Sequence, residues 1–428
     1  MMIDVVVVGA GAAGLHAAAQ LARARKRVVL LEGRERAGGR ILTERDNTWP
    51  LPVDYGPEFV HGGNRVLKNV MRIGRIQREP VKKQHWLVEA SGRRALPDAW
   101  ERIDAVMRRI GPRFRGSFAE WIAVQGDQLD AADRTLAEAF VKGFQGAPLG
   151  QMSARMLYES TKAPEEQFRI KGGYAQVVTE LLKQLPPERV TIHLRTVVKQ
   201  IEWSRERVLV RANDSEFQAR AVLVTVPLGV LQSRRGQEGH IRFLPTLGER
   251  ERLWRKLACG HATRIVFRMR ADIWRRGVIP RELRANSGGA FGFIHSEERH
   301  FPVWWSEAPH PVLIGWTGGP AAMKMSGLPP RKVFALARRT LSKLLDCDER
   351  ALNRSILDWK THDWMADPLT RGAYSFSTAR MEDAPRLMAR PIERTIFFAG
   401  EATADPLELG TVHGALASGE RAAREILK

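Results

Sequence analysis

The chain has 428 residues, 44% hydrophobic and 27% charged, a balance that fits a folded globular protein and excludes a disordered or collagen-like one. This length exceeds the usual size of a single hydrophobic core, so we expect two domains. Lysine and arginine outnumber the acidic residues by 68 to 48, a net charge of +20; because aromatic residues are not interleaved with the basic ones, the pattern favours a solvated basic surface and argues against nucleic acid as a partner.

Cysteine content and hydropathy narrow the class further. Cys259 and Cys347 lie far apart with no CxxC spacing, so they predict neither a disulfide framework nor a metal site. No apolar run approaches the roughly 18 residues that a membrane helix needs, and the first strand passes directly into a glycine loop where a secretory signal would have its cleavage site. We therefore expect a cytoplasmic protein with no transmembrane segment and no metal, and leave its oligomeric state open.

The first predicted unit is a strand, a glycine loop and a helix. Four consecutive valines at 5–8 predict a strand buried on both faces. Three glycines follow at the spacing of the dinucleotide fingerprint, in which they make a tight turn, admit the pyrophosphate and let helix and strand pack closely. A helix expected over 15–24 directs its positive end at the phosphates. The predicted phosphate-binding residues are Gly9, Gly11, Ala12, Ala13 and Gly14.

A second apolar strand, 28–31, ends on an acidic residue. Glu32 lies 23 residues beyond Gly9, the position from which a carboxylate bonds a ribose hydroxyl. We assign the following Gly33 and Arg34 to the same site. An acid here favours an unphosphorylated ribose, as in FAD or NAD.

The next segment decides between these two cofactors. Residues 35–40, Glu-Arg-Ala-Gly-Gly-Arg, resemble the second glycine pair of FAD-dependent amine oxidases, in which backbone amides and an arginine serve the pyrophosphate. The resemblance implies FAD as cofactor, with Gly38, Gly39 and Arg40 among its ligands. The alternative is an ordinary glycine turn after a strand.

Residues 53–62 form a predicted strand and turn that resemble the DxGAxWxHG segment of polyamine oxidases, which lines the substrate channel. His61 is therefore a candidate channel residue, the alternative being a loop histidine. From about 64 to 168 the pattern changes to amphipathic helices with arginine-rich faces. We interpret this stretch as the first piece of a substrate-binding domain.

Dinucleotide-fold character returns after residue 170. A glycine turn at 171–174 opens a helix, and strands are predicted at 190–194, 196–203, 208–212 and 221–226. The resemblance implies that Val198 bonds the adenine through its backbone. Residues 241–268 resemble the family's passage into the substrate sheet, and there Arg264 aligns with the lysine that in most of the family holds a water against flavin N5.

The C-terminal stretch carries the most specific motifs. Residues 358–368, 371–375, 397–403 and 410–416, with wording such as WxADPxxRGxYS and TVHGALxSG, resemble flavin amine oxidases, and are closest to polyamine oxidases and the lysine-specific histone demethylase. The resemblance implies that Tyr374 and Trp364 wall the substrate amine and the flavin. It further implies cofactor contacts at Gly400, Glu401, Thr411 and Val412.

Four departures from the family refine this hypothesis. Monoamine oxidases have a second aromatic residue where this chain has Thr411, so the polyamine-oxidase branch fits better. The cysteine that carries their flavin is replaced by Ala373, so FAD should be non-covalent. Arginine at 264 is a planar fork that stays charged, and would not place a water as lysine does. A long helical insertion like the demethylase's is not indicated, which argues against a histone substrate.

These observations predict an α/β protein: a Rossmann-type FAD-binding domain of the amine oxidase fold, interleaved with an α+β substrate-binding domain. We allot 1–80, 170–240 and 355–428 to the first domain, and 81–169 and 241–354 to the second. The expected activity oxidises a primary or secondary amine to an imine, with O2 returning as hydrogen peroxide. The alternatives are an L-amino-acid oxidase or another FAD-dependent dehydrogenase or desaturase on this fold, and a non-enzymatic basic binding protein.

Overall fold

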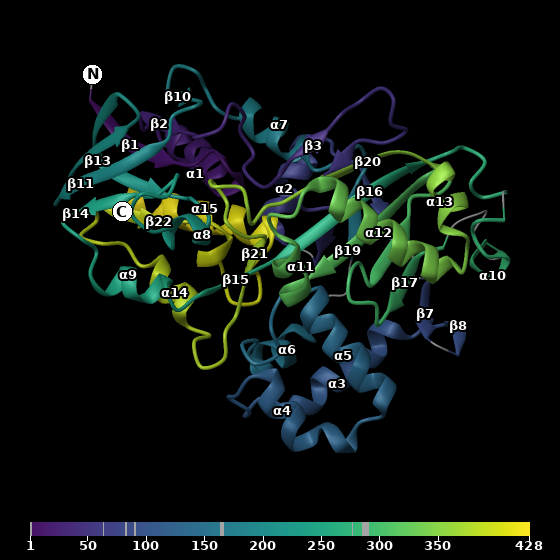
Figure 1. Cartoon of the computed structure of the whole chain (residues 1–428). Helices are drawn as coiled ribbons and strands as arrows, with labels where there is room; N and C mark the ends of the chain where they lie inside the picture. The colour runs from purple at the N-terminus through teal and green to yellow at the C-terminus, as the bar shows by residue number, and fades with distance from the viewer. Residues whose placement is uncertain are drawn as a thin grey trace.

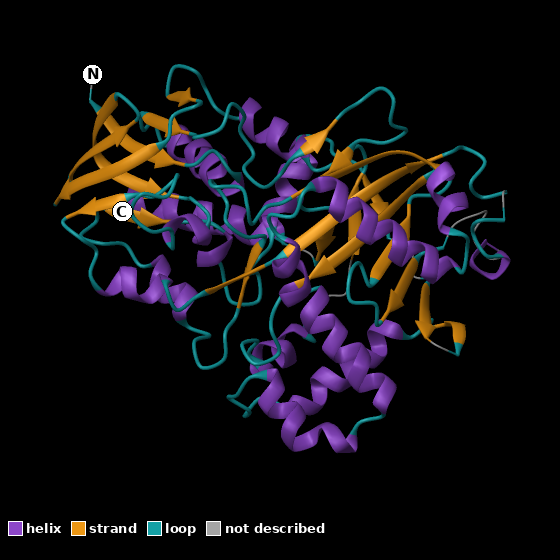
Figure 2. Cartoon of the chain, in the orientation of Figure 1, coloured by secondary structure: helices purple, strands orange, loops and turns teal. Residues whose placement is uncertain are grey.

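The computed structural model describes residues 2–62, 64–81, 84–89, 91–162, 167–275, 277–284 and 291–428. Figure 1 shows a first sheet near the N-terminus, a second sheet beside it, and a group of helices packed below them. Strands and helices mix throughout the chain (Figure 2), so the predicted α/β class is confirmed.

The first sheet has the strand order β10-β2-β1-β13-β12-β11-β14, with β22 also paired to β13. The strands β10, β2, β1, β13 and β22 run parallel to one another. Along β1, Val5 and Val7 enter the core on one face while Val6 and Val8 enter the core on the other, which explains the run of four valines. The strands are β1 (Ile3–Val8), β2 (Val28–Leu31), β10 (Val190–His193), β11 (Val198–Ser204), β12 (Arg207–Ala212), β13 (Ser215–Val224), β14 (Arg242–Leu244) and β22 (Ile396–Phe398).

Two helices from opposite ends of the chain, α1 (Ala12–Arg23) and α15 (Val412–Leu427), pack together against one face of this sheet. A Cβ added to Gly419 of α15 would lie 2.4 Å from the carbonyl oxygen of Ala13 in α1, so only glycine permits this approach. Helix α1 starts three residues before the position predicted from sequence. The Leu15 amide donates to the Gly11 carbonyl at 2.9 Å, so the helix already includes the third glycine of the loop.

The second sheet has the order β20-β16-β19-β18-β17-β7-β8 and is antiparallel except where β17 and β7 pair in parallel. Helix α12 (Pro330–Leu345) covers one face, where its apolar side shares a core with β16 and β19. The C-terminal motifs begin in strand β20. The chain after this strand returns toward the first sheet. The strands are β7 (His85–Glu89), β8 (Gly92–Ala95), β16 (Ala262–Met269), β17 (Phe293–Ser296), β18 (Val303–Ser306), β19 (Val312–Gly318) and β20 (Ile356–His362).

The interpretation of 64–168 as helices is wrong for residues 78–80, 85–89 and 92–95, which form β6 (Arg78–Pro80), β7 and β8. Burial in β7 alternates along the strand, but its parallel partner β17 lies about 200 residues later in the chain, so five residues gave too weak a local signal. This stretch also contains helices that build a core of their own. Its main helices are α3 (Ala99–Ile110), α4 (Phe118–Gln125), α5 (Ala131–Gly143) and α6 (Ala154–Ser160).

Short elements connect these parts. A two-stranded ribbon pairs β15 with β21, which belongs to the C-terminal motifs. Among the described residues, no helix is long and apolar enough to cross a membrane. The remaining elements are β3 (Thr43–Glu44), β4 (Val53–Asp54), β5 (Phe59–His61), β9 (Gln167–Ile170), β15 (Ala258–Gly260), β21 (Tyr374–Phe376), α2 (Arg65–Ile73), α7 (Ala175–Lys183), α8 (Leu228–Leu231), α9 (Glu249–Trp254), α10 (Arg281–Arg284), α11 (Gly319–Met325), α13 (Glu349–Ser355), α14 (Ala384–Ala389) and the 3-10 turns η1 (Gly126–Gln128) and η2 (Glu401–Thr403).

Candidate active site

A cavity of about 670 Å³ begins at the glycine loop after β1 and ends among helices α3, α5 and α6. Residues from both sheets and from the helical group line it. All the residues singled out from sequence contribute to its wall except Gly14, which lies behind the loop. Those on the wall are Gly9, Gly11, Ala12, Ala13, Glu32, Gly33, Arg34, Gly38, Gly39, Arg40, His61, Val198, Arg264, Trp364, Tyr374, Gly400, Glu401, Thr411 and Val412.

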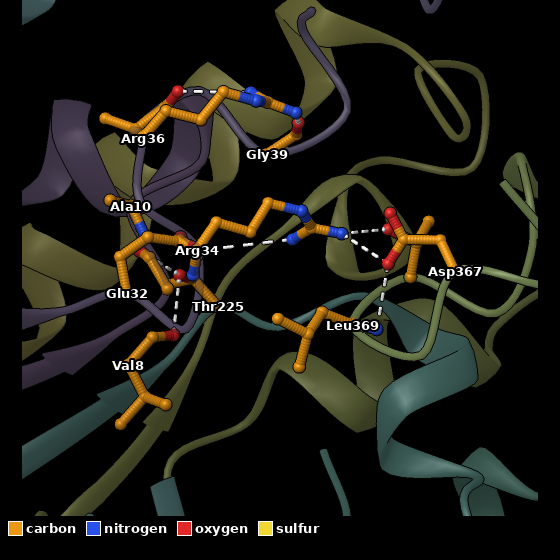
Figure 3. Close-up of polar contacts among 12 residues, drawn as sticks. Val8, Ala10, Glu32, Arg34, Arg36, Gly39, Thr225, Asp367 and Leu369 are labelled. Atoms are coloured by element: carbon orange, nitrogen blue, oxygen red, sulfur yellow. Dashed lines mark hydrogen bonds and ion pairs between the residues drawn. The ribbon is translucent and has the colours of Figure 1, made fainter. Parts of the chain in front are cut away.

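The glycine loop is built for close backbone approach. Gly9 has φ +107°, and a Cβ on Gly14 would lie 2.0 Å from the Gly9 carbonyl oxygen. A Cβ on Gly11 would meet nothing within 4 Å, so the backbone there faces open cavity. The Thr225 hydroxyl fixes the turn, with Oγ1 at 2.9 Å from the carbonyl oxygens of Val8 and Gly9 (Figure 3). Since no side chain caps α1, its first amides are left for an anion.

Glu32 holds the end of β2 against the loop. Its carboxylate accepts from the amides of Ala10 and Arg34, both at 2.9 Å, and is 4% exposed (Figure 3). The Arg34 guanidinium lies 3.8 Å from Glu32 through Nη1 and donates through Nη2 at 2.7 Å to Asp367 and to Thr370. Although burial opposes the shift, His362 at 3.6 Å and the hydrogen bond from Arg34 lower the pKa of Asp367. Arg34 therefore ties the first βαβ unit to the C-terminal motif.

The second glycine pair is folded by a neighbour that the sequence reasoning passed over. The Arg36 guanidinium donates to the carbonyl oxygens of Gly39 at 2.8 Å and of Ile41 at 3.1 Å (Figure 3). The Gly38 amide donates to Ala10 at 2.8 Å, and both glycines have positive φ, +106° and +58°. This turn therefore lies directly beside the first glycine loop.

A buried carboxylate, Glu401, joins four segments of the site. One oxygen accepts from Arg40 Nη1 at 2.9 Å and Ser375 Oγ at 3.2 Å; the other accepts from the amides of Ser375 at 3.1 Å and Gly410 at 3.0 Å. Arg40 also donates at 2.7 Å to the carbonyl of Ala373. The residue that the resemblance assigns to the cofactor's sugar-like chain thus also fixes β21 and the loop before α15.

Thr411 is the N-cap of α15. Its Oγ1 accepts from the Gly414 amide at 2.9 Å, so the N-terminus of α15 points into the cavity with its earlier amides available. Beside it lie His61, an exposed residue on the cavity wall, and His413, whose burial lowers its pKa to about 4. The imidazole of His413 is therefore neutral at pH 7, and its Nδ1 has no hydrogen-bond partner among the described residues.

The two predicted aromatic residues are held rigidly. The Tyr374 hydroxyl donates at 2.7 Å to the carbonyl of Phe144 at the end of α5, and burial raises its pKa, so it stays protonated. Nε1 of Trp364 donates at 2.8 Å to the carbonyl of Tyr55, and the residue is 5% exposed. Each polar tip is satisfied by backbone, which leaves the rings as apolar cavity walls.

Arg264 belongs to a buried chain of charges. Its Nη2 lies 2.7 Å from Glu58 Oε2, and both side chains are 9% exposed. Glu58 also contacts Arg169 at 3.0 Å and accepts from Trp305 Nε1 at 3.2 Å, while Arg169 pairs in turn with Glu307. Burial raises the pKa of Glu307 against the opposing influence of Arg169. Arg264 is thus turned to a carboxylate while still on the cavity wall.

The far end of the cavity is aromatic and acidic. The Trp100 ring centroid lies 5.8 Å from that of Phe140 and 5.2 Å from that of Phe144. Glu101 and Asp104 line the same end, brought to one side of α3 by their i, i+3 spacing. Carboxylates and aromatic faces are both surfaces that attract a cation.

These groups fit the FAD that the sequence predicts. The open backbone at Gly11 and the uncapped N-terminus of α1 offer amides to a pyrophosphate. Glu32 at the end of β2 is placed to accept a hydrogen bond from a ribose hydroxyl. The amides at the start of α15 line the same cavity away from the glycine loop, where a flavin ring would extend. Val198 lines the cavity from β11.

Comparison with known proteins agrees with this geometry. Residues 12–427 match the family described as flavin containing amine oxidoreductase. The chain is 26% identical over 459 residues to human lysine-specific histone demethylase 2, covering 99% of this chain and 53% of that protein. It is 26% identical over 455 residues to polyamine oxidase 3 of Oryza sativa subsp. japonica, covering 98% and 88%. The chain thus spans about half the length of the demethylases it matches.

Solved structures show the same fold. A triple mutant of putrescine oxidase superposes with a TM-score of 0.80 at 20% identity, covering 99% of this chain and 98% of that one. Cyclohexylamine oxidase from Brevibacterium oxydans IH-35A superposes with a TM-score of 0.78 at 18% identity, covering 100% and 99%.

Several residues of the site were not found from sequence. Thr225 and Arg36 act only through main-chain carbonyls, and Glu58 acts through partners more than 100 residues away. No local pattern marks such contacts. A signal was present for Glu101 and Asp104, since two acids three residues apart stand out in an arginine-rich helix.

The buried charge chain leads to a stability prediction. Arg264→Met leaves Glu58 paired with one guanidinium instead of two. We therefore expect the free energy of unfolding to fall by about 2–3 kcal/mol, which is near the smallest loss expected when a buried ion pair is broken. Arg264→Lys keeps a cation and should recover part of this loss. Urea unfolding monitored by tryptophan fluorescence measures both.

A matched control is Arg338→Met, which breaks the more exposed pair with Glu349 at 2.7 Å and should cost no more than about 1 kcal/mol. Equal losses for Arg264→Met and Arg338→Met would show that the buried cluster does not depend on Arg264.

Proposed function

The chain belongs to the flavin-containing amine oxidoreductases, and on that premise we propose that it oxidises the C–N bond of a primary or secondary amine. The amine loses two electrons and two protons to give an imine, which water hydrolyses to a carbonyl compound and either ammonia, from a primary amine, or a primary amine, from a secondary one. O2 takes up the electrons and protons as hydrogen peroxide. The observation that carries this proposal is the continuity of one cavity from the glycine loop to an aromatic and acidic end.

Bound FAD supplies the acceptor for the hydride that leaves the substrate carbon. The chain's own residues bind the cofactor and the amine and orient them. The N-terminus of α15, capped by Thr411, stabilises negative charge that develops beside it. Tyr374 and Trp364 give the amine an apolar, water-poor position between rigid rings. Arg264 adds a fixed positive charge on the cavity wall, partly neutralised by Glu58.

The same arrangement argues against an amino-acid oxidase. Such an enzyme needs an arginine fork free to hold the substrate carboxylate. Three arginines line the cavity in the described part of the chain, and each is paired: Arg34 with Asp367, Arg40 with Glu401 and Arg264 with Glu58. A purely structural binding protein would not need an aromatic pocket that is continuous with the space at the glycine loop.

An amine panel tests the proposed activity. Anaerobic mixing of the FAD-loaded protein with mono-, di- and polyamines should bleach the flavin absorbance with at least one of them. Tyr374→Ala should slow this reduction by about tenfold or more, since the ring no longer excludes water from the amine, while FAD content stays unchanged.

Tyr158→Ala serves as the control because Tyr158 does not line the cavity and should leave reduction unaffected. Absence of bleaching across the panel would exclude amine oxidation. An unchanged rate in Tyr374→Ala would show that the tyrosine does not face the reacting amine.

The acidic end favours a substrate with a second cationic group. We propose that Glu101 and Asp104 attract the distal ammonium of a diamine, which would offset the repulsion expected from the chain's net charge of +20. Glu101→Gln should raise KM for a diamine several-fold, up to about tenfold for one charge-assisted contact, and leave KM for a monoamine unchanged.

Glu188→Gln is the matched control, since Glu188 is exposed and lies outside the cavity wall. Steady-state peroxide formation measures the wild type and the two variants side by side. An equal rise in KM for both amine classes would contradict recognition of a distal ammonium.

We also propose that FAD is held without a covalent bond. The family's linking cysteine is replaced by Ala373, and burial raises the pKa of Cys259, across the ribbon from β21, to about 12, which keeps that thiol unreactive. Acid precipitation should therefore leave a colourless pellet and a yellow supernatant. A pellet that retains the flavin colour would contradict non-covalent binding.

A further inference from the structure

A second hollow, of about 1160 Å³, lies behind the ribbon of β15 and β21. Ala258 and Cys259 of β15 line this groove, while Tyr374 and Ser375 of the paired strand line the cavity already described. The ribbon therefore separates the two spaces. Nothing in the proposed amine chemistry uses the groove.

The groove concentrates positive charge. Five cationic side chains line it against a single carboxylate, Glu251. They come from three separate segments: the loop after α8, the end of α9 and the loop after β21. The cationic residues are Arg234, Arg235, Arg255, Lys256 and Arg380.

Four of these five cations lack partners. Arg380 pairs with Glu120 at 2.8 Å, but the side chains of Arg234, Arg235, Arg255 and Lys256 make no hydrogen bond or ion pair with any other described residue, and all four are exposed. Among the described residues, by contrast, every arginine that lines the cavity is paired with a carboxylate. Unpaired cations gathered around one concave surface reinforce one another within a Debye length.

Uncharged groups on the same wall also lack partners. Thr378 Oγ1 and His261 Nδ1 are buried without a hydrogen-bond partner among the described residues, and such atoms are ordinarily satisfied by something. Phe376 is the one aromatic ring apart from histidine among the lining residues described, and it is 4% exposed. The groove therefore offers donors and cations and no exposed ring for stacking a base.

We propose that this groove binds a ligand with two or more linked phosphate groups, such as a tripolyphosphate or the phosphate chain of a nucleotide. Arginine forks match phosphate oxygens bidentately. Because the unpaired cations come from two segments around the groove, a ligand with several linked anionic groups can contact more of them than a single phosphate can. A hollow of about 1160 Å³ favours a short chain over a long polymer.

Calorimetric titration of the FAD-loaded protein tests the proposal. At about 0.15 M salt, tripolyphosphate should bind at least tenfold more tightly than orthophosphate. ATP, compared with tripolyphosphate, distinguishes the two sources of a phosphate chain: equal affinity indicates recognition of phosphates alone, and tighter binding of ATP indicates a nucleotide. Both results support a linked-phosphate site.

The variant Arg234→Ser/Arg235→Ser should weaken tripolyphosphate binding at least tenfold. The control, Arg331→Ser/Lys332→Ser, removes the same charge from exposed positions at the start of α12, outside the groove, and should have less than a twofold effect. Equal weakening by both pairs would show that only the net charge attracts the anion and would overturn the proposal. So would affinity for hexaglutamate equal to that for tripolyphosphate, or no binding of tripolyphosphate.

Discussion

The Glu401 carboxylate is the interaction on which the site depends. Its two oxygens accept from Arg40, from Ser375 and from the amide of Gly410. The first of these belongs to the N-terminal unit, the second to the strand of Tyr374, and the third to the loop that starts α15. Because the carboxylate is 5% exposed, loss of any one donor would leave a buried charge under-satisfied, at a cost well above that of an ordinary hydrogen bond. The Glu401 carboxylate thereby holds together segments that lie far apart in the sequence.

The balance of positive and negative side chains differs between the cavity and the groove outside it. On the cavity wall each arginine meets a carboxylate, so the interior presents little unpaired positive charge to a cationic amine. The carboxylates of Glu101 and Asp104 then make the far end acidic. In the groove behind the β15–β21 ribbon the balance is reversed. The net charge of +20 therefore does not describe the field that a substrate meets.

The ribbon of β15 and β21 connects these two environments. A Cβ on Gly146, which lines the basic groove, would lie 3.3 Å from the Tyr374 ring on the cavity side. Tyr374 is also held from α5 by the carbonyl of Phe144. The position of this ring is therefore set jointly by the ribbon and by the helical group, so small shifts in either would be felt at the aromatic wall.

The sequence alone determined the first βαβ unit, the cofactor class and the family, because consecutive valines, glycine spacing and an acid at a strand end are local patterns with direct physical causes. It also indicated part of the cavity wall, through the glycine fingerprint and the family's motifs. Only the tertiary structure decided that Arg264 turns to Glu58, that Arg36 folds the second glycine pair, and that residues 78–80, 85–89 and 92–95 form strands. These features depend on partners far away in the chain, and no local spacing can specify a partner that folding alone brings close.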